Sequence, residues 1–231
     1  MTVVRAFDAA IMPRRCVFCG TVCEPNEAYC CCGCAAELPW VENRCTRCAG
    51  PLAPPVRDGV DCADCQQRPP PFVAAATPLR YTFPIDAAIK AMKFQRRLYY
   101  VQAFSPMLAQ TMARLPQDID ALLPVPLHWR RHAIRGFNQA AELCKPLQKL
   151  TGLPILANVT RIRPTPYQSG LDADERRRNL CAAFAIQGSV IARHVLIVDD
   201  VITTGETCRQ LASVVLAAGA EKVSVLAIAR A

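Results

Sequence analysis

Apolar residues in the last two-thirds of the chain alternate between short continuous runs and segments with helical spacing. Apolar stretches typical of strands buried on both faces occupy 72–81, 119–125, 195–198 and 222–229. Apolar residues three or four positions apart, typical of amphipathic helices, occupy 85–94, 98–115 and 137–150. We also expect a strand at 153–159 and a short helix at 172–182. The alternation predicts an α/β fold with a parallel sheet flanked by helices.

The string VLIVDDVITTGET, at 195–207, places a buried strand, two acids and a glycine-containing turn in one order. Asp199 and Asp200 follow the apolar run, at the carboxyl end of the strand, where open α/β sheets bind ligands. Gly205 lets the backbone turn tightly, and the amide groups that begin the next helix attract an anion. An ordinary strand and turn with surface acids is the alternative, and it would explain the two acids alone or the threonine–glycine turn alone. It explains the complete ordered string less well than a ligand site does. The string therefore indicates a site for a phosphorylated sugar.

A helix should follow this turn, because apolar residues recur with helical spacing as far as Leu216. Thr203 or Thr204 has the hydroxyl needed to cap its first turn, and Gly219 is a natural residue to end it. The spacing excludes a Walker phosphate loop and a GxGxxG dinucleotide turn.

The same string resembles the motif with which phosphoribosyltransferases bind 5-phosphoribosyl-1-pyrophosphate (PRPP). The resemblance implies that Asp199 and Asp200 orient the ribose and that the following loop holds the 5-phosphate, with Mg²⁺ bound alongside PRPP. The residues of that loop are Thr203, Thr204, Gly205, Glu206 and Thr207. Glu206 suits a phosphate loop only if its side chain points away from the ligand, because like charges repel.

The chain has 231 residues, of which 52% are hydrophobic, enough for one good core and a smaller module. No apolar run reaches the ~20 residues needed to span a bilayer, so we expect no membrane span. The short apolar stretch near the start contains Arg5 and Asp8 and makes a poor signal peptide. A cytoplasmic location is the prediction that follows.

Eleven of the 14 cysteines precede residue 66, and eight of these form four Cys-x-x-Cys pairs. In a reducing compartment such pairs bind metal, and two pairs complete the tetrahedron of one Zn²⁺ ion. Pairing in chain order gives two structural zinc sites, the first with Cys16, Cys19, Cys31 and Cys34 and the second with Cys45, Cys48, Cys62 and Cys65. Crossed pairing is the alternative. Cys30 competes with Cys31 for the first site, but Cys31 preserves the two-residue spacing.

The cysteine-rich part is expected to be a double zinc ribbon and linker at 1–71, followed by an α/β domain at 72–231. Few large apolar residues precede residue 72, so the first module should depend on metal to fold. Residues 72–231 hold 20 basic and 11 acidic side chains, whereas 1–71 holds 7 and 8. The second domain therefore carries the whole basic surplus.

Basic residues form four clusters, of which the one around Lys93 has helical spacing. Clusters placed just after predicted strands fall at the sheet edge where the two acids are expected, and a solvated face is the alternative for any one cluster. Such groups neutralise a pyrophosphate or the backbone of single-stranded DNA. The candidates for these contacts are Lys93, Arg130, Arg131, Arg135 and Arg176. Nearby aromatic residues either stack on bases or pack in the core, and these are Phe94, Tyr99, Trp129 and Phe137.

Three motifs resemble the ComF family of phosphoribosyltransferase-like competence proteins: LLPVPLHWRRHAIRGFNQAAEL at 122–143, RIRPTPYQSGLDADERRRNLCAAF at 161–184, and VLIVDDVITTGET at 195–207. The paired ribbons with ELPW at 37–40 match the N-terminal module of that family. The resemblance implies a phosphoribosyltransferase-like fold and PRPP or a related phosphosugar in the pocket. It also implies cytoplasmic handling of incoming single-stranded DNA during natural transformation, with DNA-uptake or processing proteins as partners.

Two functions of different classes follow from these observations. The first is a DNA-handling protein with a PRPP-binding pocket. The second is an active phosphoribosyltransferase that moves the ribose phosphate of PRPP to a base or amine, and a weaker third is a PRPP-sensing regulator. Turnover needs an acceptor pocket, which many such enzymes build from an added hood, and no hood is recognisable in the sequence. The motif therefore indicates the ligand more strongly than the reaction.

Overall fold

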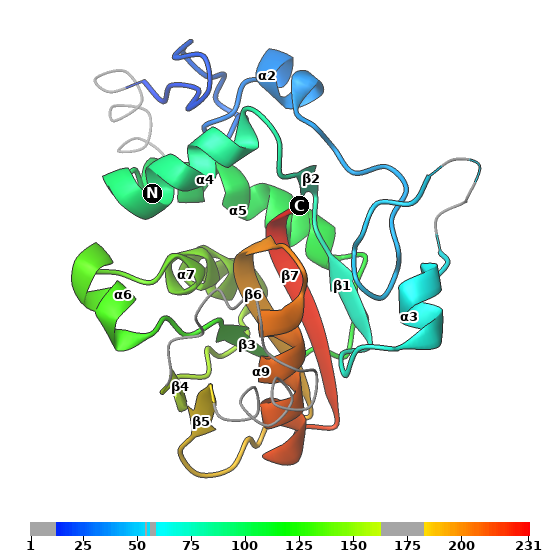
Figure 1. Ribbon diagram of the computed structural model, residues 1–231. Coiled ribbons are helices and arrows are strands. Elements are labelled where there is room, and N and C mark those ends of the chain that lie inside the picture. Colours follow the sequence, from blue (N-terminus) through cyan, green and yellow to red (C-terminus); the bar gives the residue numbers. More distant parts are fainter. Residues whose placement is uncertain (1–12, 54, 56–58, 163–182) are drawn as a thin grey trace.

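The computed structural model describes residues 13–53, 55, 59–162 and 183–231 of the chain (Figure 1). Its helices are α2 (Cys32–Glu37), α3 (Ala63–Gln67), α4 (Ile85–Gln95), α5 (Tyr99–Met112), α6 (Trp129–Arg135), α7 (Gln139–Thr151) and α9 (Glu206–Ala217). Its strands are β1 (Ala74–Ala76), β2 (Leu79–Arg80), β3 (Ala121–Pro124), β4 (Val159–Arg161), β5 (Phe184–Ile186), β6 (His194–Ile202) and β7 (Lys222–Arg230). The helix predicted at 172–182 lies outside the described residues, as does Arg176.

A five-stranded sheet forms the centre of the fold, in the order β1-β7-β6-β3, with β2 also paired to β7. All of its strand pairs are parallel. The β6–β7 ladder runs from His194 opposite Lys222 to Ile202 opposite Arg230. Strands β4 and β5 form a separate antiparallel pair. The predicted α/β fold with a parallel sheet flanked by helices is confirmed.

Burial on both faces of β6 explains the continuous apolar run in the sequence, because successive strand residues point to opposite faces. Leu196 and Val198 belong to an apolar cluster with residues of α4, α5 and α7. Val195 and Ile197 belong to a second cluster, which contains Leu211 of α9. Figure 1 shows α9 in front of the sheet and α5 and α7 behind it. Helices therefore cover both faces of the sheet.

Two predicted strands differ from the observed ones in extent. The stretch at 72–81 is divided into β1 and β2, with Thr77 and Pro78 between them, because proline has no N–H to donate to a ladder. The predicted extent of the strand at 153–159 is wrong. In that segment only Ile155 forms a bridge, to Leu122, and β4 begins at Val159. The short β3 offers few backbone partners, so pairing beside it is brief.

Helix α6 is an element that the apolar pattern did not predict. The exposed residues that make up most of it leave no apolar stripe to indicate a helix. Its ends are defined locally instead. His128 Nδ1 accepts a hydrogen bond from the backbone N–H of Arg130 at 3.3 Å, and Gly136 ends the helix with a φ of 76°.

The cysteine-rich segment packs against the open edge of the sheet. Arg80 donates its backbone N–H to the carbonyl of Pro39 at 2.8 Å, and Val41 donates to that of Pro78 at 2.9 Å. Leu38 is buried in the same apolar cluster as α4 and α5. The division of the chain at residue 71 stays a prediction. Among the helices of the described residues, none combines the length and apolarity that crossing a bilayer requires.

Candidate functional site

Asp199 and Asp200 lie in the carboxyl-terminal part of β6, and the strand continues to Ile202. Because adjacent strand residues point to opposite faces, the two carboxylates have different neighbours. Asp200 is buried on the face covered by α4 and α7. There, Lys93 Nζ lies 2.7 Å from Asp200 Oδ1, and Gln139 Nε2 lies 3.4 Å from Asp200 Oδ2.

Asp199 has its neighbours on the side of β4 and α9. Its Oδ1 accepts a hydrogen bond from the backbone N–H of Asp200 at 2.8 Å. Burial, and after it the negative charge of Asp200, raises the pKa of Asp199 to about 7, although Lys93 and Arg161 act in the opposite direction. A ligand that brings hydrogen-bond donors or positive charge would favour the carboxylate form.

The loop after β6 leads directly into α9. Helix α9 begins at Glu206 with Gly205 as its N-cap residue, so neither Thr203 nor Thr204 occupies that position. The reason is backbone geometry, since Gly205 has a φ of 78°, which favours glycine over threonine. Gly205 has no side chain to cap the first turn of α9, but Thr204 Oγ1 accepts a hydrogen bond from the backbone N–H of Glu206 at 3.4 Å. Other backbone N–H groups remain at this end of the helix.

The Glu206 side chain forms a hydrogen bond within its own helix. Its carboxylate Oε1 accepts a hydrogen bond from Gln210 Nε2 at 3.0 Å, one turn further along α9. A carboxylate in the first turn also stabilises the helix through its dipole.

Arg230, at the end of β7, contacts the first residues of this loop. One guanidinium nitrogen donates to the carbonyl of Ile202 at 3.1 Å and also to the carbonyl of Thr203. The sequence offered no local signal for this contact, because it depends on the register that places Arg230 opposite Ile202. Arg230 thereby ties the loop to the neighbouring strand.

Basic groups approach the two acids from three elements. Lys93 comes from α4, Arg135 from α6 and Arg161 from β4. Burial lowers the pKa of Arg135, while the charge of Asp200 raises it, so these two groups are close enough to interact. Burial likewise lowers the pKa of Arg161, and the charge of Asp199 opposes this. Arg161 was not among the predicted contacts.

Arg130, Arg131 and Trp129 belong to α6. Arg130 and Arg131 are exposed, and the Arg130 guanidinium lies over the Trp129 ring, 5.2 Å from its centroid. Arg135 lies similarly over Phe94, at 5.0 Å. The Trp129 residue is 62% exposed and Phe94 is 70% exposed, so neither packs in the core. Tyr99 is also exposed and Phe137 is half-buried.

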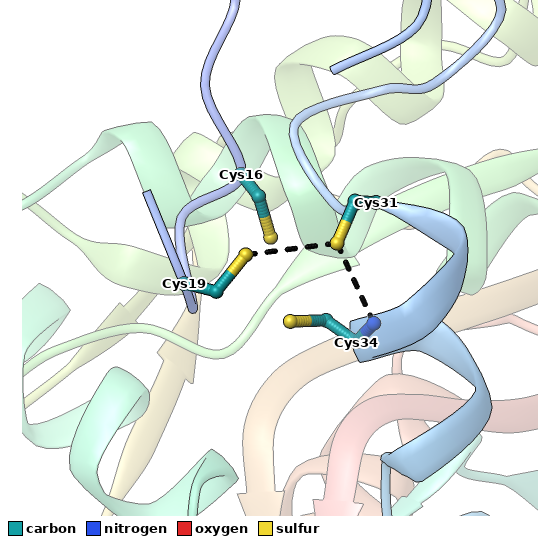
Figure 2. Close-up of side chains that lie close together, drawn as sticks. All are labelled: Cys16, Cys19, Cys31 and Cys34. Carbon is teal, nitrogen blue, oxygen red and sulfur yellow. Dashed lines mark hydrogen bonds between the residues drawn. The ribbon is translucent and has the colours of Figure 1, made fainter. Parts of the chain in front are cut away.

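The eight cysteines of the Cys-x-x-Cys pairs form two clusters, and they do so in chain order. Cys16, Cys19, Cys31 and Cys34 form the first, and Cys45, Cys48, Cys62 and Cys65 form the second. Within each cluster, all four sulfur atoms lie within 4.8 Å of one another. Figure 2 shows the first cluster, with its four side chains directed to a common centre. Crossed pairing is therefore excluded.

Sulfur spacing in both clusters fits Zn²⁺. A tetrahedral ion with Zn–S bonds of ~2.3 Å separates its ligands by ~3.8 Å. The Cys19 and Cys31 sulfurs are 3.7 Å apart, and those of Cys48 and Cys62 are 3.8 Å apart. Cys30 instead packs against the apolar cluster of α4 and α5, and Cys31 is the residue that belongs to the first cysteine cluster. Four thiolates fill a tetrahedron, so both clusters can hold structural zinc.

The protein is therefore an α/β protein with two acids at the carboxyl end of a parallel strand and with two tetracysteine clusters in its N-terminal part. No protein-family model matches the chain. The chain is 36% identical over 206 residues to the DNA utilization protein YhgH of Salmonella typhimurium, covering 87% of this chain and 89% of that protein. It is 32% identical to competence protein F of Haemophilus influenzae, over 74% of this chain and 78% of that one.

The chain belongs to the ComF family of competence and DNA utilization proteins. Competence protein ComFC of Bacillus subtilis is a more distant relative, 27% identical over 60% of this chain and 56% of that protein. Among solved structures, the adenine phosphoribosyltransferase of Leishmania tarentolae is 18% identical, with a TM-score of 0.35 over 58% of each chain.

Proposed function

We propose that this protein binds PRPP or a related phosphosugar at the carboxyl end of β6 and handles single-stranded DNA with the adjoining basic surface. The observation that carries the proposal is the position of Asp200. It lies between Lys93 and Gln139, immediately before the loop that leads into α9. Acids, cations and a helix N-terminus thus meet at one end of the sheet, where open α/β sheets bind ligands.

Each part of this site suits one part of PRPP. Ribose hydroxyls donate hydrogen bonds to Asp199 and Asp200, and backbone N–H groups of 203–207 receive the 5-phosphate. Lys93 and Arg135 supply positive charge for the pyrophosphate. Mg²⁺, held by phosphate oxygens and by carboxylates of the acid pair, would neutralise further negative charge. The Glu206 side chain bonds to Gln210, which keeps its charge along the helix.

The Lys93–Asp200 ion pair gives each of these two charges a partner when no ligand is bound. Both side chains are largely buried, at 20% and 10% exposure, so each needs a partner of opposite charge when the pocket is empty. PRPP provides hydroxyl donors for Asp200 and an anion for Lys93 at the same time. Binding of PRPP then replaces the contact between Lys93 and Asp200 with contacts from each of them to the ligand.

The DNA-binding part of the proposal depends on α6. This helix presents Arg130 and Arg131 together with the exposed Trp129 ring. Guanidinium groups bind phosphates, and an exposed indole stacks on bases whatever their sequence. The names of the relatives, which refer to DNA utilization and competence, support a DNA partner. A cytoplasmic location and DNA-uptake or processing partners belong to the same proposal.

Calorimetry with PRPP and Mg²⁺ tests the sugar site. The native protein should bind PRPP, and the Asp199→Asn/Asp200→Asn variant should lose measurable binding. The matched control is Glu142→Gln/Glu221→Gln, which also removes two negative charges but from exposed ion pairs with Lys145 and Arg193. The control should bind as the native protein does. Absence of binding by the native protein, or equal binding by the acid-pair variant, would refute the proposal.

A further inference from the structure

A cavity of about 560 Å³ lies between the segment 40–44 and the last turn of α5. It is separate from the acid pair. Its wall runs beside β1 and β2, whereas Asp199 and Asp200 belong to β6, and β7 separates these strands in the sheet. Its volume lies in the ~300–1,000 Å³ range of small-molecule sites. The site proposed for PRPP does not account for this cavity.

The aromatic wall of the cavity is fixed in place. The indole Nε1 of Trp40 donates to the carbonyl of Ala35 at 2.8 Å, which sets the orientation of the ring. Backbone hydrogen bonds hold the residues on either side of Trp40 to β2, from Arg80 to Pro39 and from Val41 to Pro78. Trp40 is nevertheless 38% exposed. A rigid, partly uncovered indole beside Pro78 offers a flat apolar surface to a ring-shaped ligand.

Polar side chains of several kinds line the rest of the cavity. Arg114 follows α5, Gln110 comes from its last turn, and Glu42 and Asn43 come from the opposite wall. Among the described residues, none of these four side chains has a hydrogen-bond or ion-pair partner. Glu42 and Arg114 therefore do not neutralise each other. The cavity combines two cations, Arg44 and Arg114, with hydrogen-bonding groups of both kinds and an aromatic face. Arg44 donates to the carbonyl of Thr77 at 2.7 Å.

We propose that this cavity binds a nucleotide. A nucleobase stacks on Trp40, and its edge exchanges hydrogen bonds with Glu42, Asn43 and Gln110, which together provide donors and acceptors. Arg114 pairs with the phosphate, as guanidinium groups do in charge-assisted contacts. The ligand is a free nucleotide or one unit of a DNA strand, since both carry the same base and phosphate. Binding here does not depend on PRPP binding at β6.

Trp40 itself reports on the cavity, because the chain has only two tryptophans. In the Trp129→Phe background, titration with deoxyadenosine monophosphate should change the Trp40 fluorescence saturably. Adding Arg114→Ala should weaken the affinity about 10- to 100-fold, the loss typical of a hydrogen bond between charged groups. Lys149→Ala, which removes an exposed positive charge from the end of α7, should leave the affinity unchanged.

The outcomes separate this site from the site at β6. No saturable change at millimolar nucleotide, or equal affinity after Arg114→Ala, overturns the proposal. Loss of the response in the Asp199→Asn/Asp200→Asn variant also overturns it, because the signal would then come from β6. An oligodeoxyadenylate that binds more tightly than the mononucleotide identifies a strand as the natural ligand. Tighter binding of the mononucleotide identifies a free nucleotide, and either result supports the site.

Discussion

Lys93 Nζ lies 2.7 Å from Asp200 Oδ1, and this ion pair joins α4 to the end of β6. If Lys93 serves the pyrophosphate, Lys93→Ala should weaken PRPP binding about 10- to 100-fold, the loss typical of a charge-assisted hydrogen bond. Ribose 5-phosphate, which has no pyrophosphate, should lose much less affinity. Isothermal calorimetry with both ligands measures the difference.

Lys90→Ala is the matched control for this prediction. Lys90 lies on the same helix and pairs with Asp86 at 2.8 Å, but that pair is exposed. Its removal should leave both affinities unchanged, because surface ion pairs contribute little. An equal loss for PRPP and ribose 5-phosphate in Lys93→Ala would contradict a contact with the pyrophosphate.

Turnover is a separate question from binding. We expect little pyrophosphate release when the protein is incubated with PRPP, Mg²⁺ and a panel of bases, because no acceptor hood is recognisable in the sequence. The rate should not exceed that of the Asp199→Asn/Asp200→Asn variant. Rapid release that depends on one base and on the acid pair would instead establish a phosphoribosyltransferase.

The basic surface predicts salt-dependent binding of single-stranded DNA. Affinity should fall steeply as salt rises, because each phosphate contact releases condensed counterions, with a slope of about −0.7 per contact. Arg130→Ala/Arg131→Ala should weaken binding and make this slope shallower by roughly one unit or more. Fluorescence anisotropy with a labelled oligonucleotide at several salt concentrations measures both quantities.

A matched DNA control removes two positive charges far from α6. Arg193 and Lys222 lie at the start of β6 and β7, at the opposite end of the sheet from the acid pair. Arg193→Ala/Lys222→Ala should change the slope little. If both double variants lower the affinity equally, net charge rather than α6 explains the binding.

The zinc clusters predict a difference between neighbouring cysteines. Native mass spectrometry should find two Zn²⁺ ions per chain, and Cys31→Ser should lower this to one, because a hydroxyl is a poor substitute for a thiolate ligand. Cys30→Ser should keep both ions, since Cys30 lies outside the first cluster. Loss of zinc in Cys30→Ser with retention in Cys31→Ser would reverse the ligand assignment.

The sequence predicted those elements and clusters that a pattern of neighbouring residues specifies. The run at Val195–Val198 predicted β6 because a strand covered on both faces must be apolar throughout. The cysteine clusters were predictable because two-residue spacing brings thiolates to one ion. Helix α6 was missed because it is exposed on most of its surface and has no apolar stripe.

Contacts between distant segments were not readable from any local pattern. The bond from Arg230 to the Thr203 carbonyl depends on strand register, and that from Gln139 to Asp200 depends on how α7 packs beside β6. The acid pair combines a feature that the local pattern predicted with one that it did not. Its location was predictable from the string, but its division between two faces follows from the continuation of β6 to Ile202.

Replacing the glycine that follows α6 should lower the free energy of unfolding more than replacing the glycine that follows α7. Gly136 ends α6 with a φ of 76°, and Gly152 ends α7 with a φ of 74°. Alanine at either position should cost about 1–2 kcal/mol of unfolding free energy, because a side chain disfavours the left-handed region. At Gly136 a Cβ would also lie 2.3 Å from a nitrogen at the far end of the Arg96 side chain, which would have to move. The same guanidinium donates to the Arg135 carbonyl at 3.0 Å, so moving it also disturbs a hydrogen bond.

Gly136→Ala should therefore destabilise the protein more than Gly152→Ala, where nothing lies within 4 Å of the added carbon. Urea unfolding of both variants measures the two free energies. In an Arg96→Ala background the extra cost at Gly136 should disappear, because the obstructing group is gone while the strain from φ remains. Equal destabilisation by the two alanines in the native background would show that the Arg96 side chain moves away without a measurable cost.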